Sequence, residues 1–320
     1  MVRPPSSHAD EVRQALAERT ILPAHLFYET AGGAANWTDL TCDAAYASAN
    51  DSADLFRRDG DAIGMTVAAM TAGRSISLVS LGPGNGWKDE LVMAAIDSAA
   101  AHGSMHYYAL DTSVILATQA MTRALTNPAL AASGVHASAL VARFDDLPEL
   151  RPIYDAGSGV NVILMLGNTL GNLADETGLL RLLAEDAMNE GDLLVLEMTL
   201  QTPGTDEIAS LGELDLIRRF NFEPLASLGL QLVPEQLTYT IAPDRSTIPG
   251  TLSIVANYRD FVVDGKHVAS ADLAYVHRYV DDAIPRALAD VGLRPCGPPW
   301  FGPSRRSMLV LARREPSQAR

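Results

Sequence analysis

Short apolar runs alternate with longer amphipathic segments between residues 75 and 200. The apolar runs predict β-strands over residues 76–81, 106–110, 137–143, 161–166 and 192–198. The segments between them repeat apolar residues at helical spacing, as residues 88–101 do after the first strand. Because strands that alternate with helices form parallel sheets, the pattern predicts an α/β core.

The pattern changes after residue 200. The predicted elements there are a helix over residues 207–219 and antiparallel strands over 237–241 and 251–258. Pro-Asp and Pro-Gly pairs at 243–244 and 249–250 mark turns next to these strands. This region is therefore interpreted as an inserted subdomain.

The end of the chain returns to the core pattern, with a helix predicted over residues 280–291 and a last strand over 307–312. Two units follow from this division. The core takes residues 65–200 plus 280–316, and an α+β substrate-binding unit takes 1–64 plus 201–279.

Composition, charge and cysteine content exclude several classes of protein. The 320 residues are 48% hydrophobic and 20% charged, which indicates a globular chain rather than a disordered or fibrous one. A formal charge of -15 repels phosphates, so neither nucleic acid nor a membrane surface is an expected partner. Two cysteines and scattered histidines predict no disulfide framework and no metal site. Without a signal-peptide or membrane-length apolar run, the sequence predicts a cytoplasmic protein.

A glycine-rich loop follows the first predicted strand. Gly82, Gly84 and Asn85 lie in it, where glycines let the backbone pass close to a bound nucleoside and the next helix offers free N–H groups. Trp87 at the start of that helix is too bulky for the tight turn of a dinucleotide site. The sequence therefore favours a methyl-donor nucleoside as the ligand of this loop. In the alternative interpretation, the loop is an ordinary turn without a ligand.

Asp111 ends the second predicted strand, where an acidic residue accepts hydrogen bonds from ribose hydroxyls. The alternative for Asp111 is a helix N-cap. Lys88, at the start of the helix after the glycine loop, either approaches the cofactor or is a solvated side chain.

Two asparagines follow the fourth predicted strand, in the string Gly167-Asn168-Thr169-Leu170-Gly171-Asn172. Ligands of open α/β sheets bind at the carboxyl ends of strands, and a buried amide without a partner costs about 1–3 kcal/mol. Asn168 and Asn172 are therefore candidate ligand contacts. In the alternative interpretation, one of them caps a helix that begins near Asp175.

These strings together resemble the histidine-specific Nα-methyltransferase family of ergothioneine biosynthesis. The likeness covers most of the chain, and the string from Gly167 to Asn172 is its most specific part. It implies a Rossmann-like class I methyltransferase core, a separate substrate domain and S-adenosylmethionine as cofactor. The implied cofactor contacts are Gly82, Lys88, Asp111 and Phe144, and the implied substrate contacts are Asn172, Tyr28 and Tyr46.

Two departures from the family pattern bear on the ligands. Arg143 stands before Phe144 where the family keeps an acidic residue, so Asp145 or a backbone group is expected to replace that contact with adenine. Ala274 and Val276 stand where the family carries the glutamate and serine that hold histidine. Each lost acceptor removes charge-assisted hydrogen bonds worth roughly 1.5–3 kcal/mol. Histidine is therefore not the expected substrate.

The expected function is methyl transfer to the amine of a small amino-acid-like molecule. Asn172 would accept an N–H from the neutral amine and aim its lone pair at the methyl carbon. Tyr28 and Tyr46 would pack on cationic groups, and Phe220 and Asn221 of the inserted unit would close over the substrate. Three alternatives stay open: transfer to oxygen or a ring nitrogen, cyclisation or lysis of the cofactor to release methylthioadenosine, and binding without catalysis. The sequence leaves the oligomeric state open.

Overall fold

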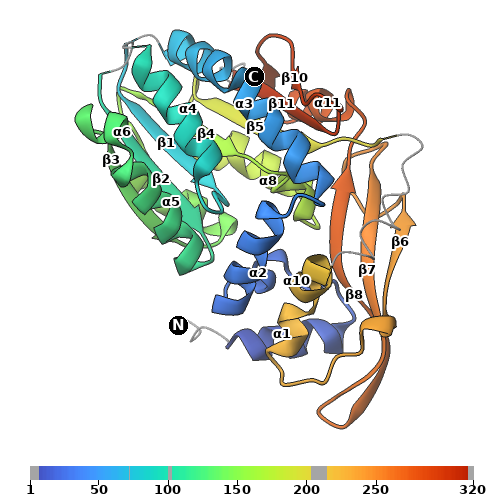
Figure 1. Cartoon of the computed structure of the whole chain (residues 1–320). Helices are drawn as coiled ribbons and strands as arrows, with labels where there is room; N and C mark the ends of the chain where they lie inside the picture. The colour runs from blue at the N-terminus through green and yellow to red at the C-terminus, as the bar shows by residue number, and fades with distance from the viewer. Residues whose placement is uncertain (1–6, 72, 100–102, 203–214, 316–320) are drawn as a thin grey trace.

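The computed structural model describes residues 7–71, 73–99, 103–202 and 215–315. A large sheet with helices on both faces forms one part of the molecule, and a smaller sheet lies beside it (Figure 1). The five predicted core strands are present, each within two residues of its predicted bounds: β1 (Ile76–Leu81), β2 (Met105–Asp111), β3 (His136–Val141), β4 (Val160–Met165) and β5 (Leu193–Thr199). The predicted α/β fold is therefore confirmed.

The strand order of the large sheet places a topological switch point between β1 and β4. The order is β10-β11-β5-β4-β1-β2-β3, and β9 pairs with β11. The C-terminal strands are β9 (Leu293–Pro295), β10 (Trp300–Phe301) and β11 (Ser307–Arg314), the last antiparallel to β5. β1 is parallel to both β2 and β4, so the chain winds outward in opposite directions from this pair. At such a switch point the loops after the two strands separate, and here they carry the two predicted ligand-binding strings.

Helices on the two faces of the large sheet bury separate apolar clusters. One face carries α3 (Ala47–Thr71), α4 (Trp87–Ser98), α5 (Val114–Thr126) and α6 (Pro128–Ala132). The other carries α7 (Leu147–Tyr154), α8 (Glu176–Leu182) and α11 (Ala283–Asp290). Every residue of β1 and β4 is buried, because side chains of a covered strand meet a helix layer on each side.

The N-terminal segment packs with the insertion after β5. The N-terminal segment contributes the helices α1 (His8–Glu18) and α2 (Ala31–Cys42). The insertion contributes the helix α10 (Asp215–Ala226) and the antiparallel strands β6 (Leu237–Ala242), β7 (Leu252–Val263) and β8 (Lys266–Arg278). Leu16, Leu225 and Tyr258 belong to their shared apolar cluster. The helix predicted over 207–219 falls partly on residues 203–214, which lie outside the described residues, and α10 begins at Asp215.

β8 has no counterpart among the predicted strands, although the sequence carries a signal for it. Asp264 and Gly265 are the two residues between β7 and β8, and their φ angles are 50° and 76°. Two consecutive positive φ angles are typical of the type I′ turn, which matches the twist of a hairpin and which Asp-Gly favours. The Asp-Gly pair therefore predicts the hairpin that periodicity misses.

Helix α3 runs through the expected boundary between residues 64 and 65. Phe56 and Ile63, before that boundary, share one apolar cluster with Val67, after it. A helix that packs as one body beneath the large sheet is a poor place for a division between units. We therefore propose that the core unit begins with α3, at Ala47.

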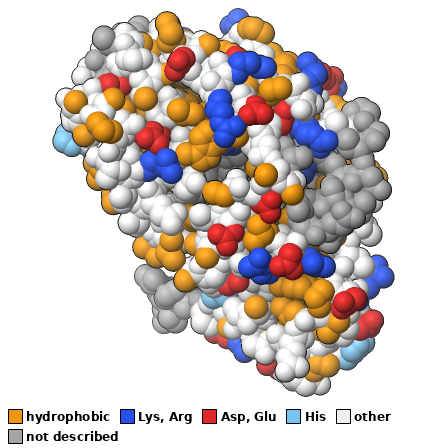
Figure 2. Space-filling model, in the orientation of Figure 1, with side chains coloured by type: hydrophobic (Ala, Val, Ile, Leu, Met, Phe, Trp, Pro, Cys, Tyr) orange, Lys and Arg blue, Asp and Glu red, His pale blue; other side chains and the backbone are white. Residues whose placement is uncertain are grey.

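Charged side chains of both signs share the face of the molecule that Figure 2 shows. The sequence's negative charge is therefore not gathered into one field on this face. Cys42 and Cys296 are both free thiols. Within the described ranges, no helix is long and apolar enough to cross a membrane.

Candidate active site

The glycine loop lies against the turn that follows β4. Gly82 has a φ of 68°, in the left-handed region that favours glycine. A Cβ added to Gly82 would lie 3.2 Å from the Thr169 side chain and 3.7 Å from Cζ of Phe144. A side chain at this position would fill the space between the predicted cofactor-binding segments. Glycine therefore leaves room for a ligand to pass close to the backbone.

Asp111 ends β2 and is buried, with 6% of its surface exposed. Its Oδ1 accepts the backbone N–H of Ser113 at 2.8 Å. Ser113 is itself the N-cap of α5, so the alternative that Asp111 caps this helix is wrong. Burial raises the pKa of Asp111 to about 7, against the opposing effect of the N–H groups of Ser113 and Thr112. A ligand that donates hydrogen bonds would stabilise the ionised carboxylate.

Cofactor affinity should follow the ionisation of Asp111. Hydroxyl donors bind a carboxylate better than a carboxylic acid, so affinity should be full above pH about 7 and fall by roughly tenfold per pH unit below it. Calorimetric titration with S-adenosylhomocysteine between about pH 5.5 and 8.5 measures this, and binding near pH 7 should release protons. In an Asp111→Asn control the dependence should vanish. An equally steep fall in that control would show that another group is responsible.

Asn168 braces the turn after β4. Gly167 and Asn168 both have positive φ, at 78° and 64°, so the chain reverses sharply. Oδ1 of Asn168 accepts the N–H of Thr199 at 2.8 Å, which joins the turn to the end of β5. A Cβ added to Gly171 would lie within 2.7 Å of the Asn168 amide, so the turn is closed over this side chain. The predicted cofactor contact of Asn168 stays a prediction.

Asn172 faces Tyr28 across the site. Its Nδ2 donates to the Tyr28 hydroxyl at 3.4 Å, although the two residues are 144 positions apart. α8 is capped by Asp175, so the alternative that an asparagine of this string caps that helix is wrong. Because Nδ2 of Asn172 is directed at Tyr28, Oδ1 of the same amide points away from Tyr28, where it can act as a hydrogen-bond acceptor.

The hydroxyl of Tyr28 stays protonated at neutral pH. Burial raises the pKa of Tyr28 well above its usual value, and Tyr46 and Asp111 raise it further, whereas Asn172 lowers it. The same interactions show that these four residues, predicted from separate parts of the sequence, lie together. Asn172 and Tyr28 are in direct contact, and Tyr46 and Asp111 are close enough to act on Tyr28 through their charge.

An aromatic wall stands beside Tyr28. The ring centroids of Tyr28 and Phe220 are 5.2 Å apart, and Trp37 lies 5.5 Å from Tyr28 and 5.6 Å from Phe220. Nε1 of Trp37 would lie 3.2 Å from a Cβ added to Gly84, so the indole also covers the glycine loop. Trp37 is not among the predicted site residues, because its place depends on the packing of α2 against α10.

Two of the predicted polar residues make local contacts. Nδ2 of Asn221 donates to the Ile217 carbonyl at 3.0 Å and to the Tyr239 hydroxyl at 3.1 Å, which links α10 to the second sheet. Oδ1 of Asn85 accepts the N–H of Trp87 at 3.3 Å, at the start of α4. Their predicted ligand contacts stay predictions.

Arg143 and Asp145, on either side of Phe144, bear on the predicted contact with adenine. Arg143 directs its guanidinium to Glu11 of α1, at 2.8 and 2.9 Å, and so ties the N-terminal helix to the end of β3. Phe144 is half-buried and Asp145 is exposed. The contact of Asp145 with adenine stays a prediction.

Lys88 lies in the first turn of α4 and forms a buried ion pair. Its Nζ is 2.7 Å from Oε2 of Glu197 on β5, and the two side chains are 14% and 2% exposed. The same Oε2 accepts the N–H of Gly167 at 2.7 Å. Ser52 of α3 bonds to both Nζ and Glu197. The alternative that Lys88 is a solvated side chain is therefore wrong.

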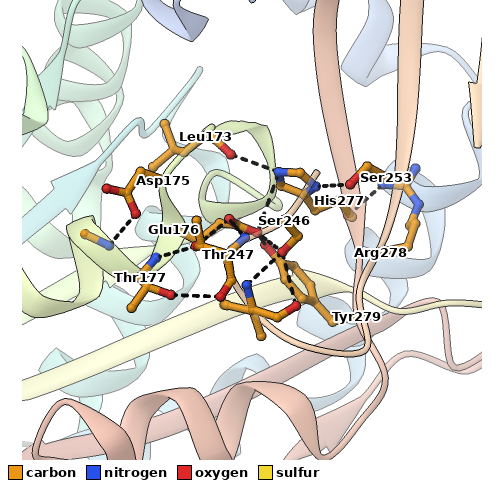
Figure 3. Close-up of polar contacts among 12 residues, drawn as sticks. Leu173, Asp175, Glu176, Thr177, Ser246, Thr247, Ser253, His277, Arg278 and Tyr279 are labelled. Atoms are coloured by element: carbon orange, nitrogen blue, oxygen red, sulfur yellow. Dashed lines mark hydrogen bonds and ion pairs between the residues drawn. The ribbon is translucent and has the colours of Figure 1, made fainter. Parts of the chain in front are cut away.

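A polar cluster centred on Glu176 and His277 lies next to Leu173, the residue that follows Asn172 in the chain (Figure 3). Glu176 and His277 are both 0% exposed. Nε2 of His277 donates to the Leu173 carbonyl at 2.9 Å, and Nδ1 accepts from Ser253 at 2.8 Å. Burial lowers the pKa of His277, against the opposing effect of Glu176, so the ring is neutral. The cluster therefore ties β8 of the second sheet to the residue that follows Asn172.

Removal of the Glu176 carboxylate should destabilise the fold. Its oxygens accept from the N–H and hydroxyl of Thr247, both at 2.9 Å, and from Ser246 and Tyr279. Glu176→Ala leaves these donors unpaired beside a cavity and should lower the free energy of unfolding by about 3–5 kcal/mol. Glu176→Gln keeps one acceptor and should cost about 1–3 kcal/mol. Urea denaturation measures both, and a loss below about 1 kcal/mol in Glu176→Ala would show that the cluster is not stabilising.

The glycine loop and the acidic end of β2 lie at the switch point of an α/β sheet, where open α/β sheets bind their ligands. A family model described as histidine-specific, S-adenosylmethionine-dependent methyltransferase matches residues 8–228, and the chain belongs to this family. The resemblance read from the sequence is confirmed. The protein is an enzyme, and S-adenosylmethionine is its cofactor.

Several solved methyltransferase structures are similar to this chain. The CcbJ methyltransferase from Streptomyces caelestis is 16% identical with a TM-score of 0.41, over 80% of this chain and 95% of that one. The sugar N-methyltransferase KedS8 from Streptoalloteichus sp ATCC 53650 is 17% identical with a TM-score of 0.39, over 82% and 92%. No curated protein sequence matches the chain.

Proposed function

We propose that this methyltransferase acts on the amine of a small amino-acid-like molecule other than histidine. The observation that carries the proposal is the hydrogen bond from Asn172 to Tyr28, close to Asp111. It turns the amide oxygen of Asn172 away from Tyr28, as an acceptor that cannot serve as a base. Such a group suits a nucleophile that arrives as an uncharged amine.

In this proposal the chain's own residues bind and orient the reactants. Gly82 and Phe144 border the place for the adenosine, and Asp111 accepts hydrogen bonds from its ribose. When bound, S-adenosylmethionine supplies an electrophilic methyl group on sulfur. Oδ1 of Asn172 accepts one N–H of the amine and thereby directs its lone pair, while Tyr28 holds the amide. Alignment of this kind accounts for a large part of the rate of a displacement reaction.

The second sheet supports the exclusion of histidine. Ala274 lies on β8 opposite Ala256, at the edge of the apolar cluster that also contains Phe220 and Tyr239. An imidazole needs both a donor and an acceptor to be held, and this surface of small and aromatic side chains is a poor match for it. A substrate with an apolar side group fits better.

The test is incubation with S-adenosylmethionine and a panel of free amino acids and simple amines, followed by mass spectrometry of nucleoside and acceptor. We expect S-adenosylhomocysteine and an N-methylated acceptor in equal amounts. Methylthioadenosine formed without an acceptor would contradict methyl transfer. Efficient methylation of histidine would contradict only the substrate part of the proposal.

A further inference from the structure

Arg218, in the first turn of α10, carries a buried donor without an acceptor. Its Nε has no hydrogen-bond partner among the described residues. Nη2 of the same guanidinium donates to Oδ1 of Asp215 at 3.3 Å, but Asp215 is exposed and also pairs with Arg219 at 3.1 Å. A buried N–H without a partner is rare in proteins, and an acceptor group of a ligand would satisfy it. Arg218 is therefore a candidate ligand contact.

The hydroxyl of Tyr239 is a second donor close to Arg218. It accepts Nδ2 of Asn221 at 3.1 Å, and no residue of the described ranges accepts its own proton. Burial raises the pKa of Tyr239 to about 12, whereas Asn221 and the positive charge of Arg218 lower it. The hydroxyl therefore keeps its proton at neutral pH and lies within reach of the charge on Arg218.

We propose that Arg218 and Tyr239 form a subsite for a carboxylate at the end of the acceptor that lies away from the methylated amine. Guanidinium N–H and phenol O–H groups both donate to carboxylates, and the bond from a guanidinium is charge-assisted. The proposal rests on the proposed function and narrows its substrate class: the acceptor carries an anionic group beyond its apolar part.

The second sheet connects the subsite to the apolar cluster beside Tyr28. Tyr239 of β6 pairs with Ala256 of β7, and Ala256 pairs with Ala274 of β8. Side chains that are directly paired across antiparallel strands lie on one face, so these three form a row. Ala274 and Tyr28 both pack against the same apolar cluster. An acceptor that extends along this row would meet methyl groups first and the hydroxyl of Tyr239 at its far end.

Asn221 orients the hydroxyl of Tyr239. Its Nδ2 donates to that hydroxyl and to the Ile217 carbonyl, so the phenol proton points away from the amide. Asn221 directly follows Phe220, whose ring centroid is 5.2 Å from that of Tyr28. Asn221 is therefore a positioning residue in this proposal, between the aromatic wall and the two donors.

The kinetic test uses pairs of acceptors that differ only in the terminal group: glutamate with norvaline, and 2-aminoadipate with norleucine. In the wild type we expect kcat/KM to be at least tenfold higher for the carboxylate in one or both pairs. Arg218→Met should abolish this preference, and Arg218→Lys should retain part of it because the charge remains. Arg219→Met changes the exposed neighbour and should keep the full preference. A wild type without preference for the carboxylate in either pair would overturn the proposal.

Binding of a simple carboxylate separates the subsite from the proposed function, because it needs no methyl transfer. Calorimetry with glutarate on enzyme saturated with S-adenosylhomocysteine should show binding to the wild type, at least tenfold weaker binding to Arg218→Met and no change in Arg219→Met. Tyr239→Phe removes one hydroxyl and should weaken binding by about three- to tenfold, which tests the subsite even if Arg218→Met has a lowered melting temperature.

The outcomes distinguish the two proposals. Equal glutarate affinity in the wild type and both subsite variants, or no binding to the wild type, would refute the subsite. If glutarate binding depends on Arg218 but the wild type methylates no amine, the proposed function fails and the carboxylate subsite stands.

Discussion

Asn172→Ala should lower kcat/KM for the acceptor by about 1000-fold and leave cofactor affinity within about twofold. The amide oxygen is the proposed contact to the amine, and its direction is set by the bond from Nδ2 to Tyr28. Alanine removes both, whereas Gly82 and Asp111, the proposed contacts to the adenosine, keep their places. Steady-state kinetics with the identified acceptor and calorimetry with S-adenosylhomocysteine measure the two quantities separately.

Two further variants serve as comparisons for Asn172→Ala. Tyr28→Phe removes the hydroxyl that the amide bonds to and should cost roughly tenfold, because the amide itself remains. Asn127→Ala is the matched asparagine control: Asn127 caps α6 by accepting the N–H of Ala129 at 2.9 Å. Its loss should lower stability by about 1 kcal/mol and leave turnover unchanged. Full activity in Asn172→Ala would rule out the amine-holding role.

Asp111→Ala should weaken S-adenosylhomocysteine binding by about 100-fold or more. Each charge-assisted bond from a ribose hydroxyl is worth roughly 1.5–3 kcal/mol, and about 1.4 kcal/mol corresponds to a factor of ten. Calorimetry measures the loss, and Asp290→Asn, which changes an exposed carboxylate on α11, should bind as the wild type does. Unchanged S-adenosylhomocysteine affinity in Asp111→Ala would contradict the proposed contact between Asp111 and the ribose.

The stability of the ligand-free enzyme distinguishes lost binding from misfolding in these variants. The pKa of Asp111 is raised to about 7 in the folded state, so its contribution to stability is present at low pH and is lost as pH rises through about 7. Asp111→Asn carries no such group. At about pH 8 its melting temperature should therefore equal or exceed that of the wild type.

The core of the fold could be predicted from the sequence because β1, β2, β4 and β5 are buried almost along their whole length. Such strands consist mostly of apolar residues, and the loops at their ends could be placed with them. Gly82 and Asp111 follow β1 and end β2 as expected. β8 was not predicted because polar residues such as Ser270 and Asp272 interrupt its apolar pattern. The pairing of β8 with β7 stabilises it as a strand.

The parts of the site that the sequence did not reveal are contacts between distant segments. Trp37 reaches the glycine loop because α2 packs where it does, and Glu197 reaches Lys88 from a strand 109 positions further along the chain. The sequence also did not reveal that Nδ2 of Asn221, whose substrate contact stays a prediction, donates to the Tyr239 hydroxyl. Residue type and spacing identify a candidate, whereas the direction of a side chain depends on tertiary packing.

The apolar cluster around Tyr28 draws on two stretches of chain, one before the large sheet and one inserted after β5. Tyr28 comes from the first stretch, and Phe220 and Ala274 come from the second. A single recombination event that moves one contiguous cassette therefore transfers only part of this cluster, which contains the proposed acceptor contacts Tyr28 and Phe220. Under the proposed function, exchange of acceptor preference between relatives by grafting requires both stretches together.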